Sequence, residues 1–167
     1  MSRGLRIAVQ VEEAQRGQVS SRWVRQVLGR FLEVQGRDED GALSVAIGGD
    51  ETLATLNQTF RGESGATDIL SFRLDDPEDA AVGVFPRPPG TAAWQGELVI
   101  SLPAVCRTAA AEGRPWRQEL AHLLAHGLLH LQGLDHTAPA ERVTMERREE
   151  ALLTELLGPH RPFHSEP

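Results

Sequence analysis

Four of the six histidines of this 167-residue chain lie within 15 residues of one another, at His122, His126, His130 and His136. His126 and His130 are four residues apart, so on a helix their imidazoles share one face, with Cβ atoms about 5–6 Å apart, and one divalent ion can bind both. Gly133 can end that helix, because glycine tolerates a positive φ, and the chain can then return His136 as a third ligand. The pattern H-x3-H-x2-G-x2-H therefore predicts a metal site.

Three neutral imidazoles suit Zn²⁺, and three protein ligands leave the fourth position for a water molecule whose pKa zinc lowers toward about 7. We therefore expect one Zn²⁺ per chain, held by His126, His130 and His136, with the zinc-bound water in the catalytic machinery. His122 lies one turn earlier on the same face and forms a rival pair with His126. The position of Gly133 favours His126 and His130, which leaves His122 for packing or for orienting a ligand.

The same spacing occurs in the metzincin proteases, whose signature is H-E-x-x-H-x-x-G-x-x-H. The second position of that signature holds the glutamate that acts as general base, and here it is Gly127. Without this carboxylate the peptidase mechanism lacks its proton acceptor. A metallopeptidase is therefore the less favoured interpretation of the histidines.

The histidine segment reads His126-Gly-Leu-Leu-His130-Leu-Gln-Gly-Leu-Asp135-His136. It resembles the H-G-x-L-H-L-x-G-x-D-H signature of the YbeY family of bacterial metal-dependent endoribonucleases. Further blocks that resemble the family follow its order along most of the chain: Leu56-Asn57-x-x-Phe60-Arg61-Gly62, Thr67-Asp68-Ile69-Leu70-Ser71-Phe72, Gly96-Glu97-Leu98 and Met145-Glu146-x-x-Glu149.

The resemblance implies a zinc-dependent endoribonuclease that cleaves single-stranded RNA. The expected process is maturation of ribosomal RNA, notably the 3′ end of the small-subunit RNA, together with ribosome quality control. The implied partners are ribosomal RNA and the small subunit or its proteins. The family's arginine, associated with catalysis or RNA binding, falls on Arg61, whose planar guanidinium could clamp a phosphate. The alternative from a different class is a ribosome-assembly factor in which zinc is mainly structural and hydrolysis is slight.

The sequence does not identify a general base. Asp135 adjoins a predicted ligand, and Glu97 begins a predicted strand where family members commonly have aspartate. Each is a candidate for orienting a metal-bound imidazole, or for catalysis. Glu146 and Glu149 share one face of the last predicted helix, where pairing with neighbouring arginines is the expected role.

The formal net charge is −7, and all 17 basic residues are arginine. Such a balance argues against bulk binding of nucleic acid, because phosphate contacts need cations. Residues 1–37 nevertheless carry a formal net charge of +4, whereas residues 38–167 carry −11. Arg22, Arg25 and Arg30 lie on the polar face of a predicted helix, as either a solvated face or an RNA-binding surface.

The chain has no apolar run of the roughly 18 residues that cross a bilayer, and its first residues lack a signal peptide's apolar segment. Cys106 is the single cysteine, which excludes an intramolecular disulfide. We therefore expect a cytoplasmic protein with no membrane partner.

Hydrophobic periodicity predicts the elements that must position these residues. Strands are expected at 5–11, 42–47, 68–72 and 96–101, and helices at about 20–35, 50–60, 102–112, 116–132 and 139–157, with Ser20 and Asp50 as helix caps. Together they indicate one α+β domain over residues 1–158, a small mixed sheet of about four strands packed with five to six helices. Residues 75–95 form a loop rich in proline and glycine, and residues 159–167 are expected to be a frayed tail.

Overall fold

The computed structural model describes residues 5–36, 41–64, 67–73, 94–134 and 137–163. Within them, β1 (Arg6–Val11), β2 (Gly41–Gly48), β3 (Ile69–Arg73) and β4 (Trp94–Ser101) form one sheet in the order β1-β2-β4-β3. The first three strands in that order run parallel, and β3 pairs antiparallel with β4. The predicted mixed, four-stranded sheet is confirmed. The predicted loop at 75–95 falls almost entirely outside the described residues.

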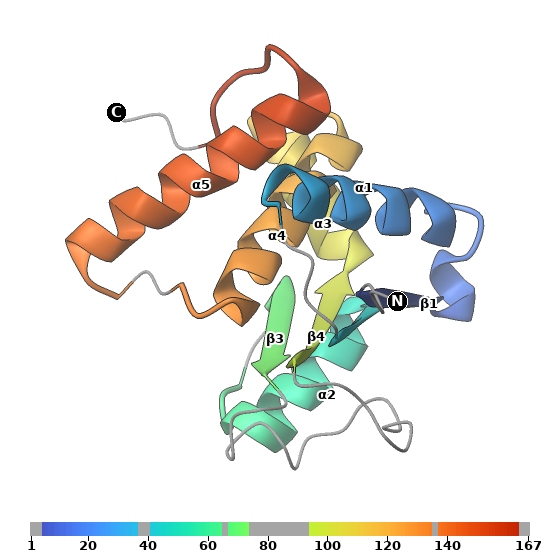
Figure 1. Ribbon diagram of the computed structural model, residues 1–167. Helices are drawn as coiled ribbons and strands as arrows, with labels where there is room; N and C mark the ends of the chain where they lie inside the picture. Colours follow the sequence, from blue (N-terminus) through green and yellow to red (C-terminus); the bar gives the residue numbers. More distant parts are fainter. Residues whose placement is uncertain (1–4, 37–40, 65–66, 74–93, 135–136, 164–167) are drawn as a thin grey trace.

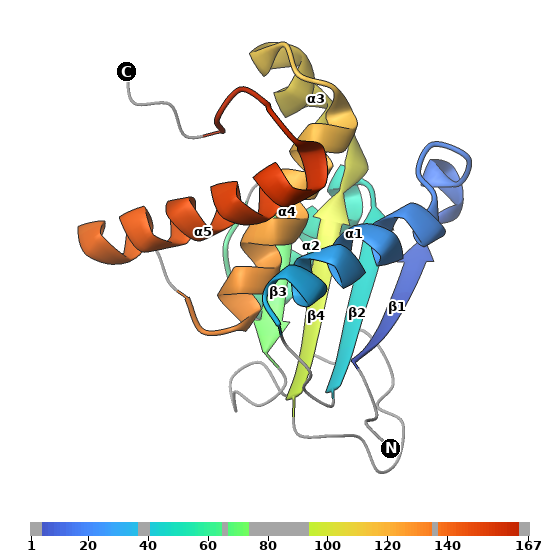
Figure 2. The ribbon, with the colours of Figure 1, turned by 45° about the horizontal axis from the view of Figure 1, so that its top comes forward.

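The helices form layers on both faces of the sheet (Figures 1 and 2). α1 (Ser21–Val34) and α4 (Trp116–Leu131) cover one face, and α2 (Asp50–Arg61) covers the other. α5 (Pro139–Leu157) packs on the outside of α4 and α1, while α3 (Leu102–Glu112) continues directly from β4. A short 3₁₀ turn at Glu13–Gln15 precedes α1. In the described part of the chain we find no helix with the length and apolar character needed to cross a membrane.

The alternation of side chains along the strands divides the core between these two faces. Leu98 and Ile100 of β4 point toward α1 and α4, whereas Val99 between them points toward α2. On β3, Leu70 and Phe72 also belong to the α2 side. The neighbouring Ser71 and Arg73 must therefore project to the α4 side, where the histidines lie.

Of the two predicted caps, one is confirmed and one is wrong. The backbone N–H of Trp23 donates to Oγ of Ser20 at 3.3 Å, which caps α1. Asp50 lies inside α2, whose N-cap is Gly49. Its carboxylate accepts hydrogen bonds from Arg107 at 2.7 and 2.9 Å and from Ser101 at 2.8 Å. These bonds, that from Arg107 above all, lower the pKa of Asp50 to about 2.

The first residues of the predicted tail are held against the domain, which differs from the expected fraying. The Phe163 ring stacks on His122, with ring centroids 4.5 Å apart, and the Arg114 guanidinium lies 3.9 Å from the Phe163 centroid. The backbone N–H of Phe163 donates to Glu150 at 2.7 Å, and His160 contacts the same carboxylate at 2.9 Å. The Phe163 side chain, with stacking partners on α4 and on the connection before it, gives this segment its fixed position.

Candidate metal centre

Helix α4 carries three of the histidines in one row, at intervals of four residues. The ring centroids of His122 and His126 are 6.5 Å apart, and those of His126 and His130 are 6.1 Å apart with an angle of 18° between the rings. The histidines share one face because leucine and alanine side chains occupy the buried faces of α4. The near-parallel pair of His126 and His130 is the arrangement that the H-x3-H spacing predicts.

Hydrogen bonds fix the tautomer of both rings in the same sense. Nδ1 of His130 lies 2.9 Å from the carbonyl oxygen of Leu134, which can only accept, so Nδ1 carries the proton. Nδ1 of His126 lies 2.5 Å from Oε1 of Glu149, which accepts in the same way. In the neutral form, each imidazole then keeps its lone pair on Nε2. A hydrogen bond to Nδ1 that orients a ring with Nε2 as the donor atom is typical of zinc-binding histidines.

Glu149 is the residue that the sequence interpretation missed. It is 1% exposed, and beyond His126 it also contacts Nε2 of His122 at 3.2 Å. Pairing with arginines was expected for it, whereas the structure turns it inward from α5 against α4. A signal was present, because Met145, Glu149 and Leu152 occupy one apolar face of α5 at helical spacing, where a carboxylate requires a buried partner.

His122 is held by carboxylates on two sides. Burial lowers its pKa, but Glu119 and Glu149 outweigh burial and raise the pKa to about 9. A protonated imidazole has no lone pair for a metal. Nε2 of His122 is also occupied by its contact with Glu149 at 3.2 Å, so the pair of His126 and His130, which the sequence favours over His122 and His126, fits a metal better. His122 lies beside Glu149, the carboxylate that also contacts Nδ1 of His126.

Gly127 shows why this site lacks the protease's glutamate. A Cβ atom at this position would come within 2.7 Å of Leu98 and 2.9 Å of Ile69, both on the sheet. Residue 127 thus faces the sheet and not the row of histidines, and α4 approaches the sheet closely only because glycine is there. A glutamate at this position would meet apolar side chains.

Two predicted site residues, His136 and Asp135, lie outside the described residues. No cluster of three metal-binding side chains occurs among the described residues, which hold two of the three predicted ligands. Gly133 has the positive φ of 94° that the sequence predicted for the turn leading toward His136. Two oriented imidazoles with lone pairs on Nε2, followed by this turn, fit a divalent ion of the zinc class.

The structure does not bring Glu97 to the histidines. Glu97 is 1% exposed and pairs across strands with Phe72, on the α2 side of the sheet. Because α4 packs on the opposite face, β4 itself lies between Glu97 and the row of histidines. The expected role of Glu97 in orienting a metal ligand has no geometric support here.

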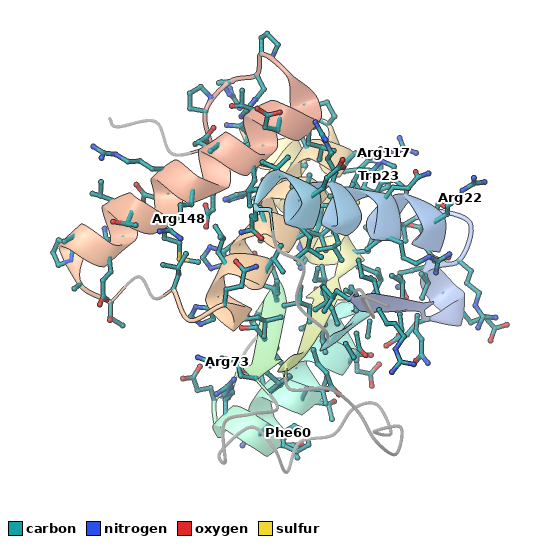
Figure 3. The ribbon with its side chains drawn as sticks, viewed as in Figure 1. Arg22, Trp23, Phe60, Arg73, Arg117 and Arg148 are labelled. Atoms are coloured by element: carbon teal, nitrogen blue, oxygen red, sulfur yellow. The ribbon has the colours of Figure 1, made fainter. Side chains whose placement is uncertain are left out.

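Arg61 ends α2 at the outer edge of β3. Its Nη2 donates to the carbonyl oxygen of Ser71 at 2.9 Å, and its guanidinium lies 5.1 Å from the centre of the Phe72 ring. Arg61 is thus on the α2 side of the edge strand whose other side faces α4. Arg73, at the end of β3, was not singled out from the sequence, and its Nη1 approaches the Gly133 turn (Figure 3).

The three arginines predicted as an RNA surface all lie on α1 but differ in their partners. Arg30 pairs with Glu33 at 3.2 Å and with Glu155 at 3.6 Å, so its charge is compensated. Arg22 and Arg25 are exposed on α1, with Arg22 at the end of the helix remote from α5 (Figure 3). Arg30 is therefore paired with carboxylates, while Arg22 and Arg25, three residues apart on one helix, stay a predicted RNA surface.

Comparison with known proteins identifies the family of this chain. The model of the family described as "Endoribonuclease YbeY" matches residues 7–157. A protein of that name from Anaeromyxobacter sp. is 39% identical over 140 residues, 84% of this chain and 67% of the relative. Another, from Aromatoleum aromaticum, is 34% identical over 155 residues, 93% of this chain and 92% of the relative. The chain spans 64% of the length of a third relative, from Anaeromyxobacter dehalogenans.

One solved structure shows the same fold. The solution structure of TM1509 from Thermotoga maritima matches with a TM-score of 0.57 at 21% identity. The match covers 92% of this chain and 89% of that protein. At this identity the likeness concerns the fold, which it confirms as a single small α+β unit.

Proposed function

Because this chain belongs to the YbeY endoribonuclease family, we propose that it is a metal-dependent endoribonuclease that cleaves single-stranded RNA. Endoribonucleases are hydrolases of phosphodiester bonds, and the family places the chain in this enzyme class, as the sequence led us to expect. Its proposed substrate is ribosomal RNA, with the 3′ end of the small-subunit RNA as the region cleaved. The proposed setting is ribosome maturation and quality control in the cytoplasm, with the small subunit or its proteins as partners.

The observation that carries this proposal is the shared orientation of His126 and His130. Glu149 and the Leu134 carbonyl accept the Nδ1 protons of the two rings, so both present Nε2 as the donor atom. We propose that these two atoms, together with His136, hold one Zn²⁺. Zinc bound in this way would supply Lewis-acid activation of water or of a phosphate oxygen.

The chain's own residues would do the positioning. Glu149 keeps the His126 ring in one tautomer, and protonated His122 balances the charge of that buried carboxylate. Arg61 is the proposed phosphate clamp, and its bond to the Ser71 carbonyl uses one N–H of Nη2. A guanidinium has five N–H donors, so it can keep some contacts while it makes new ones.

The test is cleavage of a single-stranded ribosomal RNA fragment by purified protein, with Arg61→Ala and His126→Ala prepared in parallel. We expect wild-type protein to cleave and both variants, still folded by circular dichroism, to lose activity. His160→Ala, which alters a histidine bound to Glu150 at the tail, is the matched control and should retain activity. Equal cleavage by all four proteins would identify a contaminating nuclease and remove the support for this function.

A further inference from the structure

A hollow of about 410 Å³ opens between the C-terminal end of α1, the turn after α4, and α5. Pockets of roughly 300–1,000 Å³ are the usual size for small-molecule sites in proteins. Apolar side chains from the three segments line it, namely Val34, Leu134 and Leu152. It is therefore large enough, and apolar enough, to accept one planar organic ring.

The hollow shares a residue with the metal centre. Leu134 lines it and also accepts, through its carbonyl oxygen, the hydrogen bond that orients His130 at 2.9 Å. The turn from Gln132 to Leu134 follows His130 within four residues. A ligand in the hollow would thus contact the residue whose carbonyl oxygen orients His130.

The polar groups of the hollow suit the edge of a nucleobase. Gln35 and Gln132 exchange two hydrogen bonds, of 2.9 and 2.8 Å, which fixes both amide planes. Each amide has two N–H donors and a carbonyl that accepts two bonds, so each keeps one further donor and one further acceptor site. The reciprocal pair uses the adjacent donor and acceptor of each amide, so the remaining N–H and carbonyl sites point apart and can each bond one heteroatom of a base.

A cation lies at the rim. Arg148 lines the hollow from α5, is exposed, and among the described residues has no carboxylate within 4.0 Å (Figure 3). The chain has a net charge of −7, so a guanidinium at this rim with no carboxylate partner in the described part of the chain is a place where an anionic ligand can bind. Arginine binds phosphate through its planar fork and also stacks on bases.

We propose that this hollow binds one nucleotide of the substrate RNA next to the cleaved phosphodiester, with the base against Gln35 and Gln132 and the phosphate on Arg148. This inference rests on the proposed function for the identity of the ligand. It assigns the base preference of the enzyme to the amide pair, and part of its affinity for RNA to Arg148.

The first experiment uses nucleotides that the enzyme does not cleave. The four nucleoside 5′-monophosphates, with inorganic phosphate as the fifth ligand, are titrated into ¹⁵N-labelled protein, and the side-chain amide signals of Gln35 and Gln132 are followed by NMR. We expect at least one nucleotide to shift both amides while phosphate alone does not. Shifts with phosphate that equal those with nucleotides, or no shift at all, would overturn the base pocket.

The second experiment compares Arg148→Glu with Arg147→Glu. Both residues are exposed on α5 and both changes alter the net charge equally, but only Arg148 lines the hollow. Loss of a charge-assisted bond to phosphate predicts a Kd for the preferred nucleotide, and a KM for RNA, raised about tenfold or more in Arg148→Glu alone. Equal values in the two variants would refute the role of Arg148.

The two proposals fail in different ways. If nucleotides shift the amides but the protein does not cleave RNA, the hollow stands as a nucleotide site and the endoribonuclease activity fails. If RNA is cleaved, but the amides do not shift and the two glutamate variants behave alike, the activity stands and the hollow is not a subsite.

Discussion

Glu149→Gln tests whether Glu149 of α5 orients a metal-binding histidine or whether the histidines of α4 only pack against their neighbours. Glu149 is 1% exposed and accepts from Nδ1 of His126 at 2.5 Å and from Nε2 of His122 at 3.2 Å. Glutamine has nearly the same shape but removes the negative charge and replaces one acceptor oxygen with a donor. One acceptor oxygen then remains for two N–H donors, so the His126 ring loses the charge-assisted bond that keeps its proton on Nδ1.

The size of the effect follows from the role of such partners. Loss of a hydrogen bond that orients a metal-bound histidine typically costs 10- to 100-fold in metal affinity. This corresponds to about 1.4–2.7 kcal/mol of binding free energy. The buried His122 cation also loses a neighbouring charge, so the metal-free variant should unfold more easily, by about 1–3 kcal/mol.

The assay is competition for Zn²⁺ against a chelator of known affinity, combined with urea unfolding of the metal-free proteins. Glu155→Gln is the control, since this side chain lies on the same helix, is 54% exposed, and contacts Arg30 at 3.6 Å. The control should match wild type in zinc affinity. If Glu149→Gln also binds zinc as wild type does, the inference that Glu149 orients His126 is refuted; if wild type binds no zinc, the metal proposal itself fails.

Three further predictions concern packing, charge and the tail. Gly127→Glu buries a carboxylate against the sheet and should lower the free energy of unfolding by about 3–5 kcal/mol without creating peptidase activity; an unchanged urea midpoint would contradict this. The pKa of Asp50, about 2, means that its bond to Arg107 stabilises the fold above pH 4 and is lost as the pH falls toward 2. Because the Asp50–Arg107 pair is exposed, Asp50→Asn should lower the free energy of unfolding only a little at pH 7. The difference in thermal unfolding between this variant and wild type should disappear near pH 2. A difference that widens in acid would disprove the assignment. Phe163→Ala removes the stacking on His122 and should cost roughly 1–2 kcal/mol in urea unfolding, whereas a frayed tail would give no change.

The fold followed closely from the sequence, because its periodicities are strong and its helix ends are well marked. The predicted strands and long helices appear within a few residues of their expected bounds, and Ser20 caps α1. Asp50 was predicted wrongly as a cap, since a carboxylate near a helix start can bond either to its own backbone or to a distant side chain. Only the packing of α3 beside α2, which brings Arg107 to it, decided between the two.

The sequence by itself determined the histidine pattern from which a metal site is proposed, because the spacing of His126 and His130 and the glycine at 133 act within one helix and the turn after it. Local geometry of this kind depends on backbone periodicity alone. The tertiary structure decided what surrounds that pattern. It brought Glu149 from α5 against α4, put Glu97 on the opposite face of the sheet, and joined three segments into the hollow beside Leu134. These contacts link residues far apart in the chain, and their formation depends on how helices and strands pack, which no short-range spacing encodes.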